Sequence, residues 1–241
     1  WCRVMNLKKM CLTTMLCMAI ASPLYAANDK PIDLSADVIE YDSTTGMMTA
    51  TGSVKMVQEN AVVTGMKATY NTKSKEAEID GGVHMVKEDM DLTAANVRSI
   101  DNKHVIAVGD VVLVKGTSTL TGPQVDYFLD QDYVLINSNS KISMPDGVMT
   151  SEKLEHFVKE NRAVATGNVH IVSQTRNLDA TGDVATYYGG EGQQGKIVLA
   201  GNAVAVQDNN TLRGKTLTMY LEEKPASQSN QSELVIKPNE K

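Results

Sequence analysis

A repeat of about 29 residues constrains the fold of this chain more than any other feature of the sequence. In each unit a glycine or serine, followed by a small or polar residue, precedes a run of alternating apolar residues. The repeated position falls at Gly52, Gly81, Gly109, Ser138, Gly167 and Gly201. A second signature, which ends mostly in tyrosine, keeps step with the first at Tyr41, Tyr70, Ser99, Tyr127, His156, Tyr187 and Tyr220. Internal periods of this length indicate stacked repeats, in which each unit packs mainly on its neighbours.

Each unit contains two strand-like runs separated by polar turns. Apolar residues alternate with polar ones within a run, as where Val54 and Met56 flank Lys55. A period of two predicts a half-buried strand with one face turned inward. No convincing helical stripe follows the N-terminal segment. The sequence therefore predicts an all-β fold of about thirteen or fourteen short strands, arranged as a sandwich, a barrel or a stacked solenoid.

Residues 1–26 have the pattern of an export signal. Trp1 is not an initiator residue, so we interpret residues 1–4 as a misassigned start upstream of Met5. Two lysines precede an apolar stretch, and small residues follow it up to the expected cleavage after Ala26. An uncleaved anchor is the alternative, which the shortness of the apolar stretch disfavours. We expect a short lead-in at 27–31, a repeat domain at 32–222, and a polar tail at 223–241 that is disordered unless SELVI adds an edge strand.

Composition narrows the function. All three cysteines lie within the predicted leader, so the rest of the chain can use neither disulfides nor thiol chemistry. The net charge of −6 disfavours nucleic acid as a partner, because nucleic-acid binding depends on clustered basic residues. The four histidines, His84, His104, His156 and His170, show no metal-ligand spacing, and we expect them on the solvated outer face. We expect no enzymatic activity, metal or cofactor.

The glycine-rich stretch GGEGQQGK (189–196) matches most of a phosphate-binding loop. Such a loop opens a helix and has Ser or Thr after its lysine, whereas Ile197 follows Lys196 and the chain continues as a strand. The stretch also has the repeat phase of the other turns, with three extra residues. We therefore predict a lengthened hairpin and no nucleotide site.

The inward strand faces allow two interpretations. Their residues are mainly Val, Ile, Leu, Met and Ala with few aromatics, and methionine suits a surface that accommodates variable apolar partners. Such faces could bind acyl chains, or they could simply pack a β-core, as apolar residues usually do.

The units ADVIEYDSTTGMMTATGSVKMV and KATYNTKSKEAEIDGGVHMV resemble the OstA-like module of the lipopolysaccharide-transport proteins, the LptA family. The resemblance covers most of residues 32–222 and weakens in the third and fourth repeats, at Ser99, Ser140 and Ser143. It implies a twisted β-jellyroll in the periplasm, whose apolar groove shields lipid A acyl chains between the inner and outer membranes. It further implies lipopolysaccharide, LptC-like and LptD-like domains, and head-to-tail copies of the chain as partners.

The groove candidates share the strand phase that turns a side chain inward. They are Ile39, Tyr41, Val54, Met56, Ala68, Tyr70, Val83, Met85, Val111, Leu113, Tyr127, Val169 and Ile171. Two alternatives to the bridge protein remain open. One is a membrane-anchored LptC-like component, and the other is an exported structural repeat for adhesion or surface layers, without lipid binding.

Overall fold

The computed structural model describes residues 32–101, 103–145, 147–189, 195–221 and 236–238. Within these ranges seventeen strands form one continuous antiparallel sheet, joined by turns and a single 3-10 turn, η1 (Leu129–Gln131). The predicted all-β jellyroll is confirmed. The described part of the chain contains no helix long and apolar enough to span a membrane.

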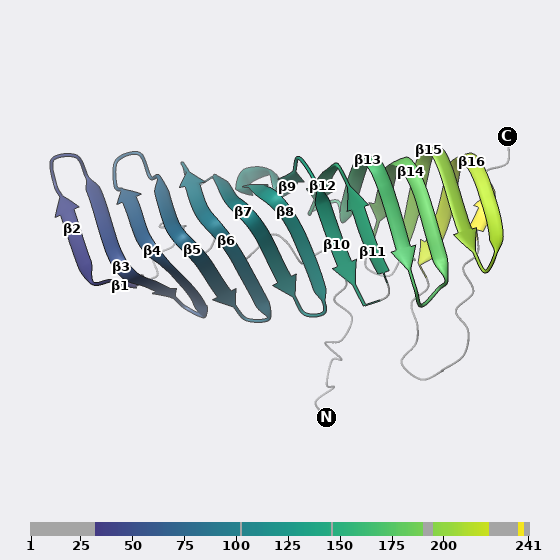
Figure 1. Ribbon diagram of the computed structural model, residues 1–241. Coiled ribbons are helices and arrows are strands. Elements are labelled where there is room, and N and C mark those ends of the chain that lie inside the picture. The colour runs from purple at the N-terminus through teal and green to yellow at the C-terminus, as the bar shows by residue number, and fades with distance from the viewer. Residues whose placement is uncertain (1–31, 102, 146, 190–194, 222–235, 239–241) are drawn as a thin grey trace, which may run out of the picture.

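The strands lie side by side as rungs along one long axis (Figure 1). Ten rungs are single long strands: β3 (Met47–Gln58), β4 (Ala61–Asn71), β5 (Ala77–Lys87), β6 (Met90–Ile100), β7 (His104–Lys115), β8 (Ser118–Phe128), β13 (Arg162–Ser173), β14 (Leu178–Tyr188), β15 (Gly195–Gln207) and β16 (Asn210–Leu221). Three more rungs consist of two short strands end to end: β1 (Asp33–Ser35) with β2 (Val38–Asp42), β9 (Tyr133–Ile136) with β10 (Ser140–Met144), and β11 (Gly147–Ser151) with β12 (Lys153–Phe157). The structure has seventeen strands, more than the thirteen or fourteen expected, because three rungs are each divided into two short strands and β17 is added near the C-terminus.

The repeated glycine is the point at which a rung bends. Gly52 and Ser53 both adopt left-handed conformations, with φ of +78° and +47°, and the pairing of β3 with β4 shifts register between Thr51 and Val54. The same paired geometry occurs at the other glycine positions of the series. Two such residues form a bulge that redirects the strand, and glycine adopts the left-handed conformation at no steric cost.

The fourth repeat shows what happens without the glycine. Ser138 is not left-handed, only Asn139 is, with φ of +48°, and the rung there is interrupted between β9 and β10. A side chain with a Cβ disfavours the left-handed conformation that glycine accepts. The weakened repeat in the sequence thus corresponds to a split rung in the structure.

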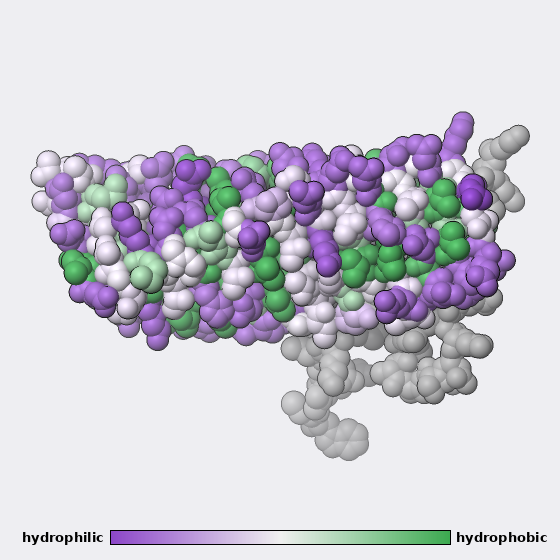
Figure 2. Space-filling view, in the orientation of Figure 1, coloured by the Kyte–Doolittle hydropathy of each residue, from purple (hydrophilic) through white to green (hydrophobic). Residues whose placement is uncertain are grey.

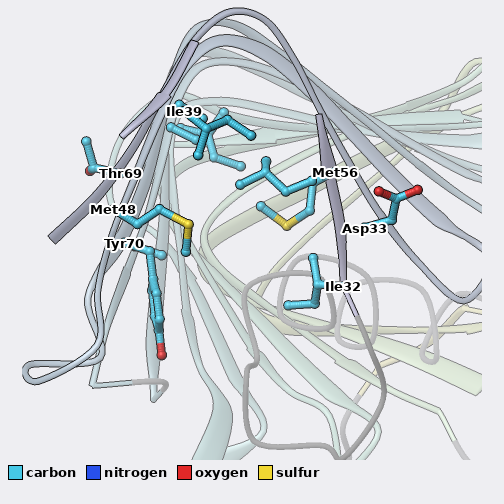
Figure 3. Close-up of a pocket in the computed structure, with 12 residues that line it drawn as sticks. Ile32, Asp33, Ile39, Met48, Met56, Thr69 and Tyr70 are labelled. Carbon is cyan, nitrogen blue, oxygen red and sulfur yellow. The ribbon is translucent and has the colours of Figure 1, made fainter. Parts of the chain in front are cut away.

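The bend divides every rung into two arms. In β3 the first arm contains Met47–Thr51 and the second arm contains Val54–Gln58. Residues of the other rungs belong to the same arm as the residues with which they pair. Figure 3 looks along the axis and shows the two arms descending from a ridge, with apolar side chains between them. The sheet is therefore a jellyroll with a V-shaped cross-section and an apolar interior between its two arms.

Glycines on the second arm allow the arms to approach closely near the ridge. A Cβ placed on Gly65, Gly122 or Gly182 would lie 2.7 Å from a side-chain carbon of Ile79, Ile136 or Leu199, respectively. These three large residues belong to the first arm and are at most 2% exposed. Interior density of this kind leaves no room for an added methyl group.

The predicted flanks fall mostly outside the described residues. The leader at 1–26 and the lead-in at 27–31 cannot be compared with the structure. Within the predicted tail, Ile236–Pro238 forms β17, which pairs with Leu217–Met219 of β16. The disordered tail at 223–241 stays a prediction, and β17 is the part of it that the structure describes. The alternative of an edge strand near SELVI (232–236) comes close to the observed position.

We predict that Gly182→Ala lowers the free energy of unfolding by about 1–3 kcal/mol, because the new methyl group overlaps Leu199 in a packed interior. The backbone of Gly182 is not left-handed, so the loss reports the contact between the arms alone. Urea unfolding measures the change. The neighbouring Thr181 is exposed, and Thr181→Ala should stay within about 0.5 kcal/mol of the wild type. Equal stability of the two variants would contradict this account of the packing.

Candidate functional site

An apolar cavity of about 510 Å³ lies between the arms at the N-terminal end of the sheet. It is lined from β1 to β5 by Ile32, Asp33, Leu34, Ile39, Met48, Ala50, Met56, Ala68, Thr69, Tyr70, Ala77 and Ile79. Figure 3 shows Ile39, Met48 and Tyr70 on one arm and Ile32 and Met56 on the other. The cavity is therefore the space between the arms, and apolar side chains from both arms form its walls.

The cavity exists because the first rung has no neighbour on its outer side among the described residues. Ile39 on β2 faces the interior and is still 47% exposed, whereas Val105, Ala107 and Leu113 on β7 are fully buried. At the opposite end Leu217 and Met219 are also buried, and β17 pairs beside them. The interior is thus open at its first rungs and filled by its own side chains farther along.

The structure places the candidate residues from the sequence along this interior. Nine are buried in the apolar cluster between the arms: Val54, Ala68, Val83, Met85, Val111, Leu113, Tyr127, Val169 and Ile171. Met56 and Tyr70 are partly buried against that cluster, while Ile39 and Tyr41 are exposed at the open end. Only Ile39, Met56, Ala68 and Tyr70 line the cavity itself. Contact of any candidate with lipid stays a prediction.

Several lining residues were missed by the sequence reasoning. Met48 and Ala50 lie directly opposite Tyr70 and Ala68 in the pairing of β3 with β4. They belong to the run between the turn after Tyr41 and Gly52, which also alternates but is weaker in aliphatic content. Extending the inward phase from one strand to its antiparallel partner identifies such residues from the sequence.

Charged groups lie mainly on the outer face, where Figure 2 shows hydrophilic residues interspersed with scattered apolar ones. Three histidines pair there with aspartates on adjacent strands, His84 with Asp91 at 2.9 Å, His104 with Asp126 at 2.8 Å and His170 with Asp179 at 3.0 Å. Within the described residues no three His, Cys, Asp or Glu side chains cluster as metal ligands. These three imidazole–carboxylate pairs keep their polar groups on the outer face.

His156 departs from the expectation that all four histidines are solvated. It occupies the tyrosine position of the repeat, so it faces the interior, and it is only 7% exposed. Burial lowers its pKa, because the charged imidazolium loses its hydration. The sequence already indicated an interior position for this side chain, because His156 belongs to the tyrosine signature of the repeat.

An outer-face ladder stabilises the weakened middle of the repeat. His104, Phe128, Tyr133, Phe157 and Arg162 are opposed in successive pairs from β7 to β13. The His104 and Phe128 rings stack at 4.2 Å, and the Arg162 guanidinium lies 4.0 Å from the Phe157 ring centroid. Burial and a 2.7 Å hydrogen bond to Glu155 raise the pKa of Tyr133 above its ordinary value. Cross-strand aromatic pairs of this kind hold the register of a sheet.

The glycine-rich stretch lies mostly outside the described residues, at 190–194. Lys196 follows it within β15 and pairs with Tyr188 of β14, and its ammonium lies 5.1 Å above the Tyr188 ring. A strand in this position agrees with the predicted hairpin setting and differs from the helix that a phosphate-binding loop opens.

His156 should make the stability of the protein depend on pH. Below about pH 6.5 the unfolded chain protonates this histidine, whereas the folded chain binds that proton only at a lower pH. The unfolded state then holds more protons, so the free energy of unfolding falls as the pH falls through this window. We predict that His156→Leu reduces the loss of stability between pH 7.5 and 5.5, measured by urea unfolding. Parallel profiles for the two proteins would contradict this assignment.

Comparison with known proteins places this architecture in a family. The model of the LptA and LptD N-terminal-domain lipopolysaccharide transport proteins matches residues 91–225, from β6 to just beyond β16. No curated protein matches the chain. A solved structure of LptH from Pseudomonas aeruginosa, described as the LptA-homologous periplasmic component of a lipopolysaccharide transport device, shares 17% identity. That match covers 61% of this chain and 96% of LptH, with a TM-score of 0.33. The family model covers more than half of the residues of this chain. The chain therefore belongs to the family of LptA and the LptD N-terminal domain, the lipopolysaccharide transport proteins.

Proposed function

We propose that this protein is a periplasmic bridge component that binds lipopolysaccharide and holds lipid A acyl chains between its arms on the way from the inner to the outer membrane. The apolar cavity at the open end of the interior carries the proposal. Its position between β1 and β5 gives acyl chains an entrance that is continuous with the long apolar interior. The export signal expected at residues 1–26 supports the periplasmic location.

The chemistry of the cavity suits acyl chains. Of its twelve lining residues only Asp33, Thr69 and Tyr70 carry polar side chains, and Asp33 is exposed. Each methylene group removed from water is stabilised by about 0.8 kcal/mol. Transfer along such an interior needs no covalent step, which is consistent with a transport protein and with no enzymatic role.

The open end also suits assembly. Val38, Ile39 and Tyr41 on the first rung, and Ile32 just before it, are between 38% and 60% exposed. A row of backbone groups lies there at the edge of the sheet. An exposed apolar edge strand is a template for the addition of a strand from another domain. Related domains of LptC-like and LptD-like proteins, or a second copy of this chain, are the partners that match this edge.

One observation favours a different function. The interior from β6 to β9 is filled by the protein's own side chains, with Val105, Leu113 and Ile136 fully buried. A purely structural repeat without lipid binding would show the same packing. An LptC-like component held in the inner membrane is a further alternative, which depends on whether the leader is cleaved.

Photo-crosslinking separates lipid transport from a structural role. A photoreactive residue at Met56, which lines the cavity, should crosslink to lipopolysaccharide in cells, because the side chain faces the space between the arms. The same residue at Lys55 should not crosslink, because adjacent strand residues point to opposite faces and Lys55 is exposed. Equal crosslinking to lipopolysaccharide at both positions, or no crosslinking at Met56, would contradict the proposed transport function.

Assembly through the first rung is testable with a matched pair of valines. Val38 is 53% exposed on β2 and does not line the cavity, so Val38→Lys should place a charge at the edge without unfolding the monomer. We predict that this variant shifts light scattering toward the monomer at concentrations where the wild type associates. Val206→Lys, at a 38% exposed position on β15, should associate like the wild type. If Val38→Lys associates like the wild type and Val206→Lys does not, the contact between copies does not involve the first rung.

A further inference from the structure

The short strand β17 lies on the C-terminal edge of the sheet, where Figure 1 shows it in yellow beside β16. It pairs antiparallel with residues 217–219, which are three of the twelve residues of β16. Among the described residues, 210–214 on the second arm have a strand neighbour only on the β15 side. The chain's own C-terminal segment therefore covers the first-arm part of this edge and leaves the second-arm part uncovered.

The two ends of the sheet differ in what they expose. Ile39 on the first rung faces the interior and is 47% exposed. Leu217 and Met219, which face the interior from β16 and pair with β17, are only 3% and 1% exposed. The interior is thus open at the first rung and closed where β17 lies.

The sequence of β17 has the features with which proteins protect a sheet edge. The strand is only three residues long, and its sequence IKP contains a lysine and a proline. Short strands, lysine and proline at an edge all discourage the addition of a further strand, and proline has no backbone N–H to donate. β17 is therefore a poor template for another strand, while it occupies the position that such a strand would take.

The directions of the strands favour β17 over a second copy at this edge. All neighbouring strands are antiparallel, and the ten undivided and three divided rungs make thirteen, so the first rung and β16 run in the same direction. A second copy stacked with its arms aligned would therefore place its first rung parallel to β16. Parallel pairs are slightly less stable than antiparallel pairs, and β17 is antiparallel to β16.

We propose that β17 is an edge guard, a strand that the first rung of a second copy must displace before the two copies join. A head-to-tail contact repeats without closing, so a molecule with two bare edges would form open-ended filaments. β17 is tethered to the edge that it covers, and a tethered segment competes at an effective concentration on the order of 1 mM. This inference rests on the assembly through the first rung that is part of the proposed function.

Shortening the chain at two neighbouring positions tests the edge guard. A chain that ends at Val235 lacks β17, and light scattering should detect its self-association at a concentration about tenfold lower than for the wild type. A chain that ends at Pro238 keeps β17 and should associate like the wild type. Urea unfolding of both shortened chains checks that the sheet is retained.

A reversible lock tests the same contact in the full chain. Thr218 and Lys237 are directly opposed in the pairing of β16 with β17, so their Cα atoms lie about 4.5–5.5 Å apart, within the range that a disulfide spans. The chain's own cysteines are confined to residues 1–26. Oxidised Thr218→Cys/Lys237→Cys should stay monomeric at concentrations at which the same protein associates after reduction.

The shortened chains also identify the strand that displaces β17. Adding Val38→Lys to the chain that ends at Val235 should abolish the gain in association, because it places a charge on the first rung. A gain that survives this change would contradict the first rung as the partner. If the chains that end at Val235 and Pro238 associate equally, or the shorter one associates less, β17 is not a guard. Crosslinking of lipopolysaccharide at Met56 does not involve β17, so its failure in the wild type would overturn lipid binding alone.

Discussion

The bend at the repeated glycine sets the shape of the whole sheet. Two consecutive left-handed residues redirect β3, β5, β7, β13 and β15, and the strands paired with them follow the bend. The glycines opposite Ile79, Ile136 and Leu199 let the two arms close on one another. A flat sheet with the same alternation would expose one apolar face along its whole length. Because every rung bends at the same place, that face is folded inward and becomes a continuous interior.

The interior serves two purposes along its length. In the middle it is a core, filled by the protein's own side chains to a density that stabilises the sheet. At the first rungs it is a cavity, because β2 has no further rung to pack against among the described residues. In the proposed function, the same exposed edge would serve both as an entrance for an acyl chain and as a surface for another strand. A ligand and a partner domain that use this end would influence each other's binding through shared residues.

The weakened repeats show how the fold tolerates departures from its pattern. Where Ser138 replaces the glycine, the rung splits into β9 and β10, and the next rung splits into β12 and β11. The outer ladder from His104 to Arg162 crosses this region on the first arm. On the second arm, a buried hydrogen bond of 2.6 Å joins the Ser140 and Ser151 hydroxyls at the base of the β10–β11 hairpin. Side-chain pairs thus add to the backbone pairing that holds the register of the split rungs.

The strand class, the repeat and the inward phase can be predicted from the sequence, because a period of two and a recurring glycine are local properties of the chain. The sequence placed Val54, Val83 and Val111 in the interior for that reason. Which interior positions are filled and which are open depends on the packing of the rungs in three dimensions. Ile39 and Val125 occupy equivalent inward positions, yet Ile39 is 47% exposed and Val125 is 1% exposed, because one lies on a terminal rung and the other lies between neighbours. Burial of a repeat residue depends on the rungs beside it, and that information is not local to its own unit.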